Sequence, residues 1–510
     1  MRARNTMKNL IASLVCEIVI IAFGFVVPRL IIDAYGSEVN GLTSTIHQIL
    51  QILNLLQAGA VGASIFQMFK PVAEKDYYQI SRVMAASRRY FFKIGFIFLA
   101  SIFVVAPIFG FTLDGNLGVF EIIIAFIILG VNGAGYFFFT SWFDILFSSH
   151  QKRFQLSIAT IIGKLVYYGL LFLVVLMRWH FTLMYVVALV GSGVKLMYLY
   201  VIYLKEFKHK LVKVENDGSF TIKNKGYLMS NQISTQAVEA MPTILITALK
   251  GLAIASVFAV YNLIQNMIKM VVKTMQCSVS EVFGNLVVSE NDNRVKKVYN
   301  LMEFVFFLVA VVLCGCACFL FMPFIFLYTN GNSLDINYVF PVLAFLIVAF
   351  AVIYCMYQPC YTLTNVLGLY KETYLQSIIC GVISIGVAIG LGLIYWPLIM
   401  IGPVFYYLSS LVYRMIIASR RVKWLVLKKF IIRVFTVLLL IVGVYFLSQY
   451  IFSSGYPLSW GKWLLFAIIT ALAVISFAGI YVLIFERKEA KDLFAYIKNI
   501  FKRKRKSIRG

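Results

Sequence analysis

The sequence predicts an all-α polytopic membrane protein, on three observations. Of its 510 residues, 61% are hydrophobic and only 13% are charged, whereas an ordinary soluble domain has about 25% charged residues. Apolar runs of roughly 20 residues recur along the whole chain, the length that an α-helix needs to cross a bilayer. The formal net charge of +25 gathers in alternate loops. This charge is therefore a topology signal and not a sign of nucleic-acid binding.

We expect about fourteen transmembrane helices. Their expected extents are 8–31, 40–66, 91–112, 118–147, 156–177, 182–204, 227–249, 252–283, 300–328, 338–364, 373–395, 397–418, 430–452 and 462–485. The first run is too long for a signal-peptide core and lacks a small-residue cleavage site, so we expect a retained helix. The basic loops are predicted to be cytoplasmic, which places both termini on that side.

The expected organisation is two six-helix bundles followed by two further helices. The predicted parts are an N-terminal bundle at 1–204, a cytoplasmic linker at 205–226, a C-terminal bundle at 227–418, helices 13 and 14 at 419–485, and a basic tail at 486–510. The linker contains the turn-like run Glu-Asn-Asp-Gly-Ser. Pro28 and Pro242 stand in equivalent places of the two halves, a weak internal repeat. The tail is either a basic amphipathic helix that binds anionic lipids or a solvated segment.

Lys269 and Lys273 lie one helical turn apart inside an apolar run. A lysine at the centre of a membrane helix costs roughly 2.5–3.5 kcal/mol, and like charges at this spacing repel. We therefore expect an anionic partner, which is either Glu17 or Glu239 or a transported anion. A transported anion is the favoured partner, because one carboxylate would leave the two lysines with net positive charge.

Polar residues at helical spacing mark one face of each of spans 1, 2, 7 and 8. Besides the two lysines, the candidates are Gln51, Asn54, Gln232, Gln236, Asn262 and Asn266. Such faces avoid lipid, so we expect them to line a central cavity. For single Gln and Asn residues the favoured alternative is hydrogen bonding between helices.

Other buried charges are weaker candidates. Arg29 and Asp33 are expected to pair at i, i+4, and Lys164 is expected to pair with Asp144 across a hairpin. Lys195 is placed to reach the cytoplasmic interface. The sequence contains no metalloprotease, phosphate-loop or nucleophile-elbow motif. We expect neither an enzyme nor a cofactor or metal site, and we interpret the eight cysteines as packing residues.

The N-terminal region resembles a known family. Asn5-Thr-Met-Lys-Asn9 and Pro28-Arg-Leu-Ile-Ile-Asp-Ala-Tyr-Gly36, followed by Val39-Asn-Gly-Leu42, are similar to bacterial polysaccharide repeat-unit flippases of the O-antigen or capsule type. These belong to the multidrug/oligosaccharidyl-lipid/polysaccharide exporter superfamily. The resemblance implies a cytoplasmic-membrane flippase that moves undecaprenyl-diphosphate-linked oligosaccharide to the outer leaflet by alternating access around a cationic cavity. Polysaccharide polymerase machinery is a further partner that it suggests.

The resemblance also implies roles for residues of this chain. Arg29, Lys269 and Lys273 would bind the diphosphate, with Lys164 and Lys195 as further candidates, and the Asn and Gln residues would face sugar hydroxyls. Related flippases often have arginine where this chain has lysine, so point-charge binding replaces bidentate recognition. Ion coupling or charge compensation would fall to Glu17, Asp33, Asp144 and Glu239.

Two alternatives stay open at this point. A drug/cation antiporter of the same superfamily would need an acidic cavity, which the lysines oppose. A polysaccharide-polymerase-type membrane enzyme would present a large outer loop with catalytic acids or arginines, whereas the outer loops here are short.

Overall fold

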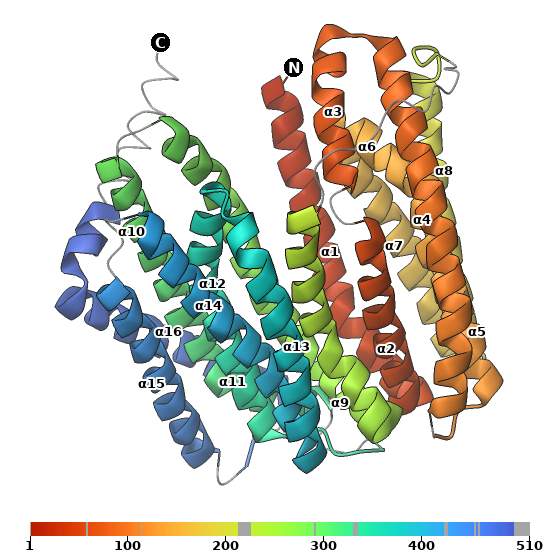
Figure 1. Cartoon of the computed structure of the whole chain (residues 1–510). Coiled ribbons are helices and arrows are strands. Elements are labelled where there is room, and N and C mark those ends of the chain that lie inside the picture. The colour runs from red at the N-terminus through yellow and green to blue at the C-terminus, as the bar shows by residue number, and fades with distance from the viewer. Residues whose placement is uncertain are drawn as a thin grey trace. The chain divides into compact units, whose positions relative to one another are not determined.

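The computed structural model is built from helices joined by short connections (Figure 1). It describes residues 2–57, 60–113, 115–212, 226–289, 292–329, 335–422, 427–452, 455–456 and 459–493. The turn-like run of the expected linker and most of the basic tail lie outside these residues. The chain divides into two compact units, unit 1 at Met1–Ala259 and unit 2 at Val260–Gly510. The division into six-helix bundles stays a prediction.

Unit 1 is a bundle in which α7 packs against both α1 and α8, and α4 packs against α5. Its elements are α1 (Arg2–Tyr35), α2 (Ser37–Leu53), η1 (Asn54–Gln57), α3 (Ala60–Glu74), α4 (Tyr77–Thr112), α5 (Val119–Gly135), η2 (Tyr136–Thr140), α6 (Ser141–Ser149), α7 (Arg153–Leu176), α8 (Thr182–Glu206) and the first part of α9 (Gly226–Ser289). Its core is rich in phenylalanine, including Phe91, Phe98 and Phe126. Many large apolar side chains point outward, as lipid contact requires.

Unit 2 contains the rest of α9 and the helices that follow it. These are α10 (Asp292–Val309), η3 (Ala310–Cys314), α11 (Gly315–Tyr328), α12 (Pro341–Val366), α13 (Tyr370–Ile394), η5 (Trp396–Met400), α14 (Ile401–Arg421), α15 (Leu427–Ile451) and α16 (Trp460–Phe485). Helix α14 packs against α12 and α13, and α11 packs against α15 and α16. The Tyr261 hydroxyl donates to the Tyr338 carbonyl (2.9 Å) and accepts from the Phe340 amide (2.9 Å), which fixes the start of this unit.

The described helices support the expected set of membrane spans. Twelve of them are long and apolar enough to cross a bilayer, or thirteen when α2, η1 and α3 count as one broken span. The longest, Asn231–Cys277, has 47 residues, about 70 Å of helix and twice what a bilayer needs. Gly251 interrupts it with φ 82° and ψ 178°, a conformation that glycine adopts readily. The turn therefore separates the spans expected at 227–249 and 252–283.

One expected helix is interrupted. The sequence predicts a continuous span over 40–66, but α2 with η1 and α3 are separate helices bent by about 40°. Two other spans contain π-helical turns, η2 and η3, where the helix is locally wider. Nothing in the apolar pattern marks these positions, because both turns lie in sequence that is apolar on every side, where a shift of the helical face leaves no signal.

The residues that carry the family resemblance hold helices together. The Asn9 side chain donates to the Gln151 carbonyl (3.1 Å) and accepts from the Phe154 amide (2.8 Å), joining α1 to the start of α7. The Asn40 side chain donates to the Ser256 hydroxyl (2.8 Å) between α2 and α9.

Candidate functional site

A glycine-to-glycine contact brings α7 and α8 together at the centre of the candidate site. A Cβ atom on Gly163 would lie 2.6 Å from the Gly191 carbonyl oxygen and 2.9 Å from the Lys195 Cβ. A Cβ atom on Gly191 would lie 2.7 Å from the Gly163 carbonyl oxygen. Only glycine permits this backbone approach, a common device between membrane helices. It places Lys164, which follows Gly163, beside Lys195.

Lys164 and Lys195, hereafter the lysine pair, are both partly buried. Their charges are close enough to act on each other. The Lys164 ammonium lies 5.5 Å from the Tyr167 ring centroid and 5.6 Å from that of Tyr168, within the range of cation–π attraction. Among the described residues, neither lysine forms an ion pair with a carboxylate.

The expected Lys164–Asp144 pair does not form. The oxygens of Asp144 accept hydrogen bonds from the Tyr136 hydroxyl (3.2 Å) and the Ser148 hydroxyl (3.1 Å). These two partners lie close to Asp144 in sequence, on η2 and α6, so they satisfy it locally. The Asp144 charge still acts on Lys195, and one carboxylate against two ammonium groups leaves the region cationic.

Helix α2 contributes a polar edge to the same region. The Lys164 charge acts on His47, which belongs to the polar face expected for the second span. The Thr43 hydroxyl lies 3.0 Å from the Tyr185 hydroxyl of α8. The tyrosines of α7 and α8 were missed by the sequence analysis, because aromatic residues are common throughout an apolar helix and carry no periodic signal.

The local charge pair of α1 forms as expected. Arg29 Nε lies 2.8 Å from an Asp33 carboxylate oxygen, so this arginine already has an anionic partner. Glu17 is exposed and, in the described part of the chain, pairs with none of the candidate lysines.

Gln51 and Gln236, two of the candidate polar residues, contact each other. Gln51 Nε2 donates to Gln236 Oε1 (3.0 Å), which joins α2 to the first part of α9. This is the interhelical hydrogen bond that the sequence analysis favoured for single amides. Asn54 and Glu239 are partly buried in the same unit, and Gln232 is exposed.

The remaining candidates lie on the part of α9 that belongs to unit 2. Asn262 and Lys269 are partly buried, whereas Asn266 and Lys273 are exposed. Lys269 has a contact within the structure. The candidate residues of the sequence therefore divide between the units, with the lysine pair and Arg29 in unit 1 and Lys269 and Lys273 in unit 2.

Unit 2 holds two buried arginines that the sequence analysis did not single out. Arg433 of α15 donates to Glu303 of α10 (2.8 Å) and, through two nitrogens, to Glu486 (both 2.9 Å). Arg414 of α14 donates to the Thr364 hydroxyl (2.8 Å), and the Tyr361 ring centroid lies 5.2 Å from its guanidinium. Arg414 falls within the span expected at 397–418, and the structure buries it inside α14.

The fold of the chain is similar to that of solved transporters that are named as members of the MOP superfamily. It is similar to a multidrug resistance MATE family transporter in an inward-facing conformation, with a TM-score of 0.65 and 12% identity over 79% of this chain and 94% of that one. It is also similar to lipid II flippase MurJ in an inward closed conformation, with a TM-score of 0.66 and 14% identity over 93% and 98% of the two chains. A MOP superfamily transporter from Pyrococcus furiosus matches with a TM-score of 0.51 and 12% identity over 82% and 94%. No protein-family model and no curated protein sequence matches the chain.

Proposed function

We propose that the chain flips undecaprenyl-diphosphate-linked oligosaccharide from the inner to the outer leaflet of the bacterial cytoplasmic membrane, by alternating access, for cell-surface polysaccharide synthesis. The observation that carries the proposal is the lysine pair. Two ammonium groups lie in the middle of two membrane helices without a carboxylate ion pair among the described residues. Such an arrangement is costly unless an anion offsets it.

A diphosphate fits the chemistry of this pair. Lysine binds phosphate as a compact point charge with rotatable donors and does not impose the planar geometry of arginine. The rings of Tyr167 and Tyr168 stabilise the Lys164 ammonium without neutralising it. Its charge therefore stays available to an incoming anion. We assign Arg29 of unit 1 a supporting role toward this anion, and we keep Lys269 and Lys273 as candidate anion-binding residues of unit 2.

The amides of unit 1 suit the sugar part of the substrate. Gln51 and Gln236 use one hydrogen bond on each other, and an amide side chain has four hydrogen-bonding positions. Together with Asn54 and Gln232, and with Asn262 and Asn266 of unit 2, they would bind sugar hydroxyls. Glu17, Asp33, Asp144 and Glu239 are the candidates for charge compensation.

The fold supports a transporter with this type of cargo. One similar structure is named a lipid II flippase, and others are named multidrug transporters, so transport is common to both. A net cationic region favours an anionic lipid over a drug cation. The neighbours are not enzymes, which argues against the polymerase alternative.

A reconstituted vesicle assay tests the proposal. Wild-type protein should move a fluorescent undecaprenyl-diphosphate oligosaccharide between leaflets, and the Lys164→Gln/Lys195→Gln double variant should move it about 100-fold more slowly, since each charge-assisted contact is worth roughly 1.5–3 kcal/mol. Lys70→Gln is the control, because the Lys70 side chain is 83% exposed. Undiminished flipping by the double variant would refute the assignment of the lysine pair. Export of a cationic dye without lipid flipping would favour the antiporter.

A further inference from the structure

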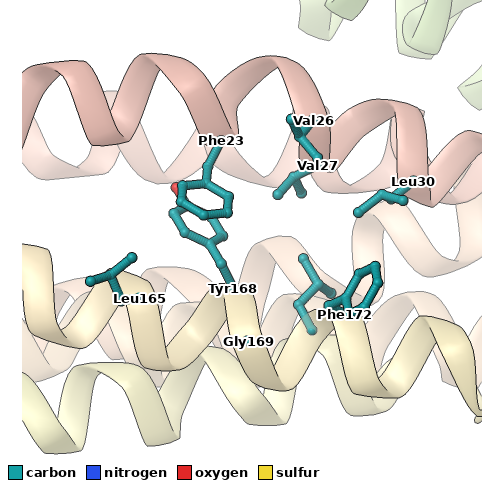
Figure 2. A pocket seen from close by; sticks show the side chains of 9 residues that line it. Phe23, Val26, Val27, Leu30, Leu165, Tyr168, Gly169 and Phe172 are labelled. Carbon is teal, nitrogen blue, oxygen red and sulfur yellow. The ribbon is translucent and has the colours of Figure 1, made fainter.

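An apolar groove runs along unit 1 between α1 and α7 (Figure 2). It has a volume of about 290 Å³. Its lining residues are Phe23, Val26, Val27, Leu30, Leu165, Tyr168, Gly169, Leu171 and Phe172. The Phe23 and Tyr168 rings stack across the gap at 4.0 Å between centroids, with Leu165 on one side of the stack and Phe172 on the other.

The groove is open to the lipid. Val26, Leu165 and Phe172 are each about half exposed, at 49%, 48% and 49%. Gly169 leaves part of its wall empty, because a Cβ atom added there would meet no atom within 4 Å. A long hydrocarbon chain in the bilayer can therefore enter the groove from the side without displacing protein.

Tyr168 connects the groove to the lysine pair. One ring lines the groove and also lies 5.6 Å from the Lys164 ammonium. Leu165 follows Lys164 directly, and Phe172 lies two turns further along α7, about 12 Å away. A lipid whose head group is bound at Lys164 would have its chain leave directly into the groove.

We propose that this groove holds the isoprenoid chain of the carrier lipid next to its diphosphate while the diphosphate is bound by the lysine pair. The inference rests on the proposed function and adds to it a binding site for the hydrocarbon tail of the lipid. Lys164 is the twelfth of the 24 residues of α7, so it lies near the middle of the bilayer. A resident phospholipid keeps its phosphate at the interface, roughly 15 Å away. Only a lipid whose head group has been drawn into the protein combines a phosphate at Lys164 with a chain in this groove.

Filling the groove tests the proposal, and two glycines make a matched pair. Gly169→Leu should occupy the groove, whereas Gly193→Leu on α8 adds the same side chain outside it, and an added Cβ at either glycine meets no atom within 4 Å. Both changes replace a helical glycine, so both variants should fold at least as well as wild type. The two probes are undecaprenyl diphosphate and dimethylallyl diphosphate. Dimethylallyl diphosphate has a single isoprene unit, which does not reach Gly169.

We expect Gly169→Leu to bind undecaprenyl diphosphate about tenfold more weakly, since it displaces roughly two methylenes' worth of apolar contact. Its affinity for dimethylallyl diphosphate should equal that of wild type, and Gly193→Leu should match wild type with both probes. A photoreactive undecaprenyl diphosphate, with benzophenone on its first isoprene units, should label peptides of α1 and α7.

The possible outcomes distinguish failure of the groove proposal from failure of the proposed function. Equal binding of undecaprenyl diphosphate by both glycine variants, with the lysine variants still impaired, would overturn the groove and leave the function standing. Displacement of the photoreactive lipid by phosphatidylglycerol alone would show a bulk-lipid site and also overturn the inference. If the wild-type protein bound neither diphosphate, both the groove proposal and the proposed function would be overturned.

Discussion

The lysine pair of unit 1 and Arg433 of unit 2 are both cationic, but they are held in opposite ways. Arg433 is 2% exposed, and its guanidinium donates to Glu303 and Glu486. The lysine pair has tyrosine rings and a more distant Asp144 in place of such partners. One site is satisfied by the protein itself, and the other leaves positive charge for something else to bind.

The difference separates structural from functional charge in a membrane protein. A buried cation whose three nitrogens each donate to a carboxylate fixes helices in place, as Arg433 does for α10, α15 and the segment after α16. That segment is anchored further where Lys429 pairs with Glu489 and Lys297 pairs with Asp492. An under-compensated cation destabilises the empty protein and attracts an anion, as the proposed function requires.

The largest effect should follow from breaking the Arg433 cluster. Arg433→Gln leaves the buried Glu303 without its cation and Glu486 with only Lys429 (3.4 Å), which should lower the free energy of unfolding by about 3–5 kcal/mol. Thermal unfolding in detergent measures this loss. Arg421→Gln is the control, since its pair with Glu372 is exposed (3.4 Å) and should contribute less than about 1 kcal/mol. Equal losses would remove the contrast between the two kinds of cation.

Unit 1 should be most sensitive at a backbone contact and not at a charge. A Cβ atom on Gly41 would lie 1.8 Å from the Leu252 carbonyl oxygen of α9. Gly41→Ala must push α2 away, at an expected cost of about 1–3 kcal/mol. Gly24→Ala on α1 is the matched control, because its Cβ would meet nothing within 4 Å. A stable Gly41→Ala variant, by thermal unfolding, would contradict this close packing.

The Gln51–Gln236 hydrogen bond should contribute a small coupling. A double-mutant cycle with Gln51→Leu and Gln236→Leu should give about 0.6 kcal/mol, the average for such bonds in membrane proteins. Denaturant unfolding of the four proteins measures it. A coupling near zero would indicate that the two amides are held apart in solution and are free for a ligand.

Removing a member of the lysine pair should change stability in the direction opposite to Arg433→Gln. Lys164→Gln and Lys195→Gln each relieve repulsion between like charges, so each should leave the free energy of unfolding unchanged or slightly raised, by less than about 0.5 kcal/mol, which thermal unfolding measures. A large loss of stability would mean that the lysines are structural.

The smallest expected effect is a pH dependence at the edge of unit 1. Burial lowers the pKa of His150, which follows α6, and the nearby charges of Lys152 and Lys210 act in the same direction. The folded state therefore binds the proton more weakly than the unfolded chain does. Stability is complete above the ordinary histidine value of about 6.5 and is lost as the pH falls below it. His150→Gln should reduce the difference between thermal midpoints at pH 7.5 and 5.5, and an unchanged difference would exclude His150 as the cause.

The sequence predicted most of the fold, because bilayer thickness dictates the length of apolar runs. It also predicted the Arg29–Asp33 pair, since i, i+4 contacts follow from helix geometry alone. The bend between α2 and α3 was missed, because the run over 40–66 is apolar on both sides of it and its pattern reads as one continuous helix.

The site was harder to predict than the fold. The neighbours of Lys164 depend on the contact between Gly163 and Gly191, which lie 28 positions apart. No periodicity within one helix encodes such a contact. The predicted pair of Lys164 with Asp144 was wrong, because the Tyr136 and Ser148 hydroxyls donate hydrogen bonds to this carboxylate. Arg433 and its carboxylates come from three segments far apart in sequence, so no pattern in the sequence predicted that they would be in contact.

The glycine contact between α7 and α8 has a consequence for selectivity. Because the two backbones touch beside Lys164 and Lys195, the Cα atoms of the two lysines are held close together on one rigid support. We expect two such charges to favour a diphosphate, whose two phosphates can each contact one ammonium, over a monophosphate, whose charge is confined to one phosphate group. A carrier that has delivered its sugar and lost one phosphate would then be a poor ligand, and the spent lipid would not compete with the loaded one.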